Sequence, residues 1–566
     1  MHDLVLRGGT IVDGTGGAPF AGDIAINGDT ISVVGEGVGA GRQELDVDGL
    51  LVTPGFVDVH THYDAQALWD PLVGSSCWHG VTTVVMGNCG VGFAPVRRQQ
   101  RDWLINLMQG VEDIPADVLR AGLDWRWETF GQYLDALGAT SRAIDIAAQV
   151  PHAPVRVYAM GERGLDGAER PNADELATIA QVTRDALVDG AVGVSTLRTR
   201  MHRSSDGRLI PTYCATDEEL LALATGMRDA GRGVLEVASD YSAGSVAEEF
   251  ARYRMMAEHS GRPVTVPFSQ THDDPDGWRE VLGHIETAAR DGLPFSAQIA
   301  VRPVGLIMSL ESRNHLFSSC PTYQDMAGLA LSERVSRLRD ADIRRRILEE
   351  ATAVPTRIDL ARTFAMESPV DYEPDVSRSI ATRAQAGGQR PLELAYDALL
   401  ADEGTAVLYA PQRNYAGGDC DSVRDMLASP CAVPGLGDGG AHCTQICDMS
   451  FPTTLLTLWG RDRRRGDLFD IAWLVRKQTA VTAALYGFAD RGRIAPGMRA
   501  DLNGIDFTHL GVHPPRMAYD FPAGGKRLIQ RADGYRYTIV AGALTFVDGE
   551  HTGALAGRVV RRGGNR

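Results

Sequence analysis

The stretch Pro54-Gly55-Phe56-Val57-Asp58-Val59-His60-Thr61-His62-Tyr63-Asp64 carries the strongest structural signal in the chain. An apolar run leads up to Val59 and ends in two histidines that are one residue apart. Residues i and i+2 of a β-strand point to the same face, so His60 and His62 project together from the end of a strand. Two imidazoles placed in this way can form half of a zinc site. We therefore interpret the pair as metal ligands rather than as structural histidines.

The overall composition is that of an ordinary globular protein. The chain has 566 residues and a formal net charge of -17, which argues against nucleic acid or an anionic membrane as a partner. No apolar signal segment follows Met1 and no run of about 18 apolar residues occurs, so we expect a cytoplasmic protein. The eight cysteines are scattered, and we expect no disulfide framework. The sequence does not decide whether the chain forms a homo-oligomer.

Both ends of the chain have the pattern of β-structure. Near the N-terminus, Gly-Gly, Asp-Gly and Asn-Gly pairs separate short apolar runs at 4–7, 10–12, 23–26 and 30–34, and such pairs are hairpin signals. Runs at 536–540 and 544–547 repeat this pattern around Ala541-Gly542. Because the termini of compact chains often lie close together, we expect residues 1–52 and 495–566 to form one small β-sandwich domain.

Between these ends, strand-like runs alternate with helical stretches. The sequence predicts helices at 172–189 and 217–230, and strands at 81–86, 191–195, 234–238, 264–268 and 295–300. Repeated β-α units of this kind favour a parallel sheet closed into a TIM-like (β/α)8 barrel, which we place at residues 53–494. The charged segment at about 306–389 looks irregular, and we expect it to be an insertion that acts as a lid over the site.

Further candidate residues follow other predicted strands. Cys89 comes after the strand at 81–86, where a thiolate could bind zinc, although a buried unreactive thiol explains the position equally simply. Asp438 stands between a short apolar run and a glycine pair. It is either a turn residue or, in a metal barrel, a metal ligand that accepts a proton from water. His442 either reaches the same site or caps the next helix.

These motifs resemble the amidohydrolase superfamily and, within it, the D-aminoacylase (N-acyl-D-amino-acid deacylase) group. The resemblance covers nearly the whole chain and rests on residues 5–16, 52–62, 80–90, 189–196 and 492–502. It implies a metal-dependent barrel with a small β domain and N-acyl amino acids as substrates, with the D configuration favoured. It also implies a zinc site held by His60, His62 and Cys89, with Asp438 as the fourth ligand or as the neighbouring base.

The chain departs from this group at two strand ends. Ala238 and Gln270 stand where histidines usually follow the fifth and sixth strands. Asp240 and His272 are the nearby residues that could replace them. Many superfamily members bridge two metals with a carboxylated lysine, but no lysine precedes Lys477 in this chain. We therefore expect one tightly bound Zn2+ and leave a second metal undecided.

Three functions stay open on the sequence alone. The first, which we favour, is hydrolysis of an amide bond, most simply the deacylation of N-acyl (D-)amino acids by a zinc-activated water with Asp438 as the base. The second is hydrolysis of another C–N bond, in a cyclic amide, a carbamate or a xenobiotic amide, which the altered strand ends would fit. The third is a catalytically inactive barrel used for binding. Retention of His60, His62 and Asp438 argues against this third function.

Overall fold

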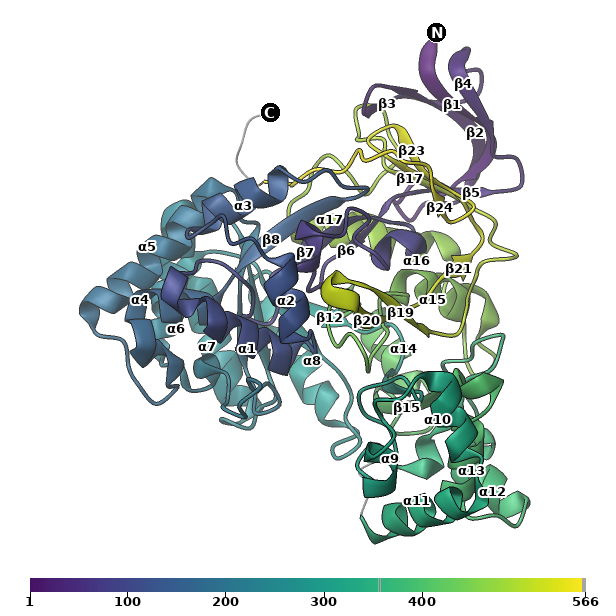
Figure 1. Cartoon of the computed structure of the whole chain (residues 1–566). Helices are drawn as coiled ribbons and strands as arrows, with labels where there is room; N and C mark the ends of the chain where they lie inside the picture. Colours follow the sequence, from purple (N-terminus) through teal and green to yellow (C-terminus); the bar gives the residue numbers. More distant parts are fainter. Residues whose placement is uncertain (355, 357, 562–566) are drawn as a thin grey trace.

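Eight parallel strands form the centre of the computed structural model, which describes residues 1–354, 356 and 358–561 (Figure 1). In chain order they are β6 (Phe56–Asp58), β7 (Val81–Met86), β8 (Asp145–Pro151), β9 (Gly193–Arg198), β10 (Val234–Ser239), β11 (Val264–Phe268), β12 (Phe295–Ile299) and β16 (Ala432–Pro434). Just beyond β6 and β16, the Asp438 N–H donates to the His60 carbonyl and the His62 N–H donates to the Gly439 carbonyl. These bonds join the two edges of the sheet, and the predicted barrel is confirmed.

The helices between the strands begin at local sequence signals. Helices α5 (Ala173–Asp189), α6 (Asp217–Ala230) and α7 (Val246–Ser260) each follow a polar residue whose side chain accepts a hydrogen bond from the third backbone N–H of the helix. These capping residues are Asn172, Thr216 and Ser245. Each helix buries its apolar face against the barrel, and the helices predicted at 172–189 and 217–230 are confirmed.

Both ends of the chain contribute to one mixed sheet of nine strands. It contains β1 (His2–Ile11), β2 (Phe20–Asn27), β3 (Thr30–Gly35), β4 (Gly41–Asp46), β5 (Leu51–Pro54), β17 (Leu502–Ile505), β22 (Tyr535–Val540), β23 (Ala543–Val547) and β24 (Glu550–His551). The antiparallel pair β5–β17 joins the N-terminal strands to the C-terminal ones. One prediction was wrong: β1 is a single strand, and Gly8-Gly9 forms an irregularity within it rather than a turn between two strands.

A lobe inserted between β12 and β16 extends away from the barrel, at the lower right of Figure 1. Its small sheet consists of β13 (Val304–Met308), β14 (Phe364–Ala365) and β15 (Leu408–Arg413). Its helices are α9 (Pro321–Gln324), α10 (Leu331–Leu338), α11 (Ala341–Ala353), α12 (Ile380–Ala386) and α13 (Pro391–Leu399). The expectation of an irregular segment was wrong, since these helices enclose their own apolar core and α13 lies beyond residue 389.

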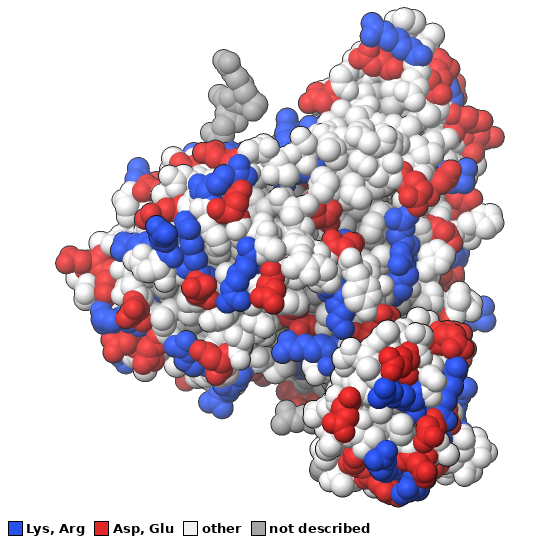
Figure 2. Space-filling view, viewed as in Figure 1, with Lys and Arg blue, Asp and Glu red and all other residues white. Residues whose placement is uncertain are grey.

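The surface carries both signs of charge. Figure 2 shows basic and acidic side chains interspersed over the viewed face, without a broad patch of one sign. Across the described part of the chain, no helix combines the length and the apolar character needed to cross a membrane.

Candidate metal centre

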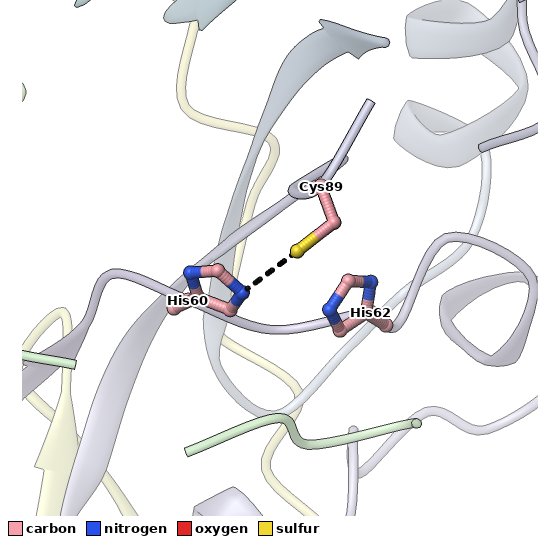
Figure 3. Close-up of side chains that lie close together, drawn as sticks. All are labelled: His60, His62 and Cys89. Atoms are coloured by element: carbon pink, nitrogen blue, oxygen red, sulfur yellow. Dashed lines mark hydrogen bonds between the residues drawn. The ribbon is translucent and has the colours of Figure 1, made fainter. Parts of the chain in front are cut away.

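Side chains from three strand ends converge where β6, β7 and β16 finish. The ligand atoms of His60, His62 and Cys89 all lie within 4.8 Å of one another. Figure 3 shows the three side chains pointing toward a common space, with the His60 Nε2 atom 3.4 Å from the Cys89 Sγ atom. The Asp438 Oδ1 atom lies 3.4 Å from His60 Nε2 and 3.8 Å from His62 Nε2. We call these four residues the donor cluster.

The backbone around the donor cluster is held in unusual conformations. Cys89 and Asp438 have φ values of 56° and 45°, a left-handed region that residues other than glycine seldom adopt. Such backbone strain tends to gather at functional sites. Glu236 of β10 supports Cys89, because its buried carboxylate accepts a hydrogen bond of 2.9 Å from the Cys89 N–H. The Ser195 hydroxyl supports the same turn, since it donates to the Gly87 carbonyl at 2.5 Å.

Both histidines have polar partners on the side that faces away from the cluster. The Gln298 Oε1 atom of β12 lies 2.8 Å from His60 Nδ1. An amide oxygen can only accept, so Nδ1 carries the proton and the lone pair of Nε2 faces Cys89 and Asp438. The Glu112 Oε1 atom lies 3.3 Å from His62 Nδ1. A hydrogen-bonded outer partner such as Gln298 fixes the tautomer and the orientation of a metal-binding histidine, whereas Glu112 is a close neighbour of His62 without a hydrogen bond to it.

The electrostatics of the cluster suit a bound cation. Burial lowers the pKa of both His60 and His62, so both imidazoles are neutral, as metal binding requires. Burial and then the carboxylate of Glu236 raise the pKa of the Cys89 thiol. The Asp438 Oδ1 atom is buried without a hydrogen-bond partner among the described residues. Two imidazoles, one thiol and one carboxylate match the donor types that zinc prefers, so these residues fit a zinc ion.

The other predicted site residues lie outside this cluster. The Asp240 carboxylate accepts hydrogen bonds from the Thr199 hydroxyl and from the Arg200 N–H, both at 2.7 Å. His272 is held by the inserted lobe, where Arg362 Nη1 donates to its Nδ1 atom at 2.9 Å. His442 is close enough for its charge to affect the pKa of His60, but it is not one of the clustered donors.

Ala238 and Gln270, the two positions at which the family resemblance leads us to expect histidines, are not among the clustered donors. Ala238 is a buried residue of β10. The Gln270 side chain is engaged by neighbouring loops, since its amide donates to the Pro275 carbonyl at 3.0 Å and accepts from the Ala416 N–H at 3.0 Å. Neither Asp240 nor His272 is placed among the clustered donors instead.

Sequence reasoning missed four residues at this site. Glu236 and Gln298 are polar residues within otherwise apolar strands, and this interruption is a signal that could have identified them. Glu112 and His202 lie in connecting segments, where no pattern in one sequence distinguishes them from solvent-facing residues. Their positions become apparent only once the loops are folded.

Comparisons with known proteins agree with this architecture. A D-aminoacylase of Alcaligenes xylosoxydans xylosoxydans is 28% identical over 585 residues, covering 99% of this chain and 98% of the relative. A crystal structure of D-aminoacylase superposes with a TM-score of 0.65 at 24% identity and covers 99% of this chain and 100% of that one. An N-acyl-D-glutamate deacylase from Bordetella bronchiseptica, complexed with zinc and a phosphonate inhibitor, has the same identity and TM-score, with 99% of each chain covered. A sequence model of the amidohydrolase family matches residues 43–546, and the chain belongs to that family.

Proposed function

We propose that this chain is a zinc-dependent amidohydrolase that removes the acyl group from N-acyl amino acids, with the D configuration favoured. Membership of the amidohydrolase family and full-length similarity to a D-aminoacylase support the reaction class. The observation that carries the proposal is the donor cluster, in which the buried Asp438 Oδ1 atom has no hydrogen-bond partner among the described residues. A binding barrel without catalysis would have no need to converge these four side chains.

In this proposal the ion is held by the whole donor cluster, namely His60, His62, Cys89 and Asp438. Zinc bound there supplies a Lewis acid for the scissile carbonyl and lowers the pKa of a water toward about 7. The described residues contain one group of three or more clustered His, Cys, Asp or Glu donors, which supports one tightly bound zinc ion. A second metal is not part of the proposal.

Asp438 is the proton carrier. Its side chain is 20% exposed, whereas those of His60 and His62 are 1% and 3% exposed, so Asp438 lies on the open side of the cluster. Its carboxylate accepts a proton from the attacking water and then donates that proton to the amide nitrogen as the C–N bond breaks. Gln298 holds the His60 imidazole in orientation through the hydrogen bond to Nδ1 at 2.8 Å, and Glu112 lies 3.3 Å from His62 Nδ1.

A second candidate is the hydrolysis of a different C–N bond, in a cyclic amide, a carbamate or a xenobiotic amide. The specific observation that favours it is the changed side of the barrel, where Ala238 and Gln270 replace the usual histidines. The remodelled loops around Asp240 and His272 would give that side a different pocket shape.

The proposal also includes the domain boundaries, the role of the inserted lobe and the location of the protein. We place the small β domain at residues 1–52 and 495–566 and the barrel at 53–494, with the inserted lobe acting as a lid. Contacts at the end of the barrel where the strands finish support the lid, since Arg362 binds His272 and Arg313 of the lobe pairs with Asp113 at 2.6 Å. We propose a cytoplasmic enzyme with a small-molecule substrate and without a nucleic-acid or membrane partner.

A substrate panel tests the proposed function. Zinc-loaded protein is assayed with N-acetyl derivatives of D- and L-amino acids, and with a hydantoin and an aryl carbamate as representatives of the second candidate. We expect turnover of the N-acyl-D-amino acids and a zinc stoichiometry near one per chain. Turnover of the cyclic amide or carbamate alone would favour the second candidate. A protein without bound zinc and without activity on any of these substrates would contradict both.

A further inference from the structure

The loop that follows β9 reaches the segment that follows β7. Its Ser205 N–H donates at 3.0 Å to the carbonyl of Asn106, a residue of helix α1 (Arg101–Val111), which comes after β7. The contact is close, because a Cβ atom added at Gly110 of α1 would lie 2.2 Å from the Arg203 carbonyl oxygen. The loop therefore spans from the fourth strand to the helix after the second strand, and that helix is followed directly by Glu112, whose Oε1 atom lies 3.3 Å from His62 Nδ1.

Asp240 fixes the start of this loop. Its carboxylate accepts from both the Thr199 hydroxyl and the Arg200 N–H, and the Met201 N–H in turn donates to the Thr199 hydroxyl oxygen at 3.0 Å. Further along, the Ile210 N–H donates to the His202 carbonyl at 3.2 Å. These bonds thus hold the backbone of the loop at His202 and just before it.

The His202 side chain has an unused polar atom at this position. Its Nδ1 atom is buried and has no hydrogen-bond partner among the residues that the structure describes. Burial and then the nearby charge of His442 lower the pKa of His202 to about 3, with the Asp240 carboxylate opposing this shift and His60 adding to it. The imidazole is therefore neutral near pH 7 and offers one N–H donor and one lone pair. Buried polar atoms in native proteins are normally paired, so an unpaired one beside a reaction site suggests a partner that arrives with the substrate.

We propose that His202 contacts the substrate and donates a hydrogen bond to the scissile carbonyl oxygen. This inference rests on the proposed amide hydrolysis. The bond strengthens as negative charge develops on that oxygen, so it stabilises the tetrahedral state more than the planar substrate. No proton is transferred to or from His202. Asp240 is then a positioning residue, which acts by holding the loop.

The test compares binding of two ligands to the zinc-loaded full chain by isothermal titration calorimetry. One ligand is a phosphonate analogue of an N-acyl-D-amino acid, which mimics the tetrahedral state. The other is the planar N-acyl-D-amino acid itself, and because the enzyme turns it over, its affinity is followed through KM. The variants are His202→Leu, which removes the donor, and His202→Asn, which keeps an N–H donor. His259→Leu serves as a matched control, because His259 lies on α7 and its Nε2 atom contacts Thr225.

We expect His202→Leu to weaken phosphonate binding by roughly 10² to 10³, the range found when one oxyanion donor is removed, and to change KM much less. His202→Asn should recover most of the phosphonate affinity, and His259→Leu should behave as wild type. All variants should keep the wild-type zinc stoichiometry. If His202→Leu binds the phosphonate as tightly as wild type, or loses affinity for both ligands equally, the inference is wrong and the proposed function stands. If wild-type protein neither binds the phosphonate nor turns over the amide, the proposed function itself fails.

Discussion

The two sides of the open end of the barrel carry different chemistry. Where β6, β7 and β16 finish, four donor side chains converge, Gln298 holds the His60 imidazole, and Glu112 lies 3.3 Å from His62 Nδ1. Where β10 and β11 finish, the polar side chains Asp240 and His272 are bonded to loops and to the inserted lobe. We infer that metal chemistry is concentrated on the first side, while the second side shapes the loops that cover the site.

The largest expected effect comes from the paired histidines of the first side. Substituting His60→Ala or His62→Ala should remove bound zinc and activity together, because each substitution takes away one donor of a four-donor site. Zinc content after dialysis and turnover of an N-acyl-D-amino acid give the two measurements. Full zinc and full turnover in either variant would show that this pair is structural.

Asp438→Asn should produce the next largest effect. The amide keeps the shape of the side chain but cannot accept the proton, so kcat should fall by roughly 10² to 10⁴, as is typical when a general base is lost. Substrate affinity should change much less. Steady-state kinetics on zinc-replete protein separate the two quantities. Near-normal kcat would reassign Asp438 to the turn in which its φ of 45° places it.

A smaller effect on zinc affinity is expected from Gln298, which contacts a ligand rather than the metal. Gln298→Leu removes the acceptor of the His60 Nδ1–H and should weaken zinc affinity by about 10- to 100-fold, the range measured for such outer partners. Competition with a chelator of known affinity measures the change. The matched control is Gln181→Leu on the outer helix α5, where the Gln181 amide donates to the Asp185 carboxylate on the exposed face of the helix. Equal zinc affinity in both variants would mean that Gln298 does not support the site.

The smallest effect on zinc should come from the second side. His272→Leu removes a hydrogen bond to Arg362, so the free energy of unfolding should fall by about 0.5–1.5 kcal/mol, while zinc stoichiometry stays that of wild type. Chemical denaturation and metal analysis of the same sample check both parts. Loss of zinc in this variant would place His272 in the metal site and remove the contrast between the two sides.

The sequence predicted those parts of the molecule that depend on local periodicity. The barrel strands follow from short apolar runs, and the shared direction of His60 and His62 follows from the two-residue period of a strand. The role of Asp438 stayed ambiguous because a glycine-rich segment predicts a turn as well as a site. Its proximity to the histidines became visible only when β16 closed the barrel beside β6.

Other features depend on contacts between distant segments, so no local sequence pattern indicates them. His202 acquires its position from Asp240 and from the crossing of its loop to α1, and neither contact is encoded near residue 202. The sequence indicates no regular structure in the lobe because its helices are short and strongly charged, and their apolar faces pack against one another and against β13 and β15. The Gly8-Gly9 pair predicts a turn, but β1 continues through it by pairing with strands on both sides.

The central claim is that zinc is bound by a mixed set of donors that includes the Cys89 sulfur. X-ray absorption at the zinc edge of the loaded protein tests this directly. The account predicts one sulfur neighbour at about 2.3 Å together with nitrogen and oxygen neighbours near 2.0–2.2 Å, and loss of the sulfur signal in Cys89→Ala with weaker zinc retention. A shell of nitrogen and oxygen alone in the wild-type protein, with full zinc retention in Cys89→Ala, would contradict it.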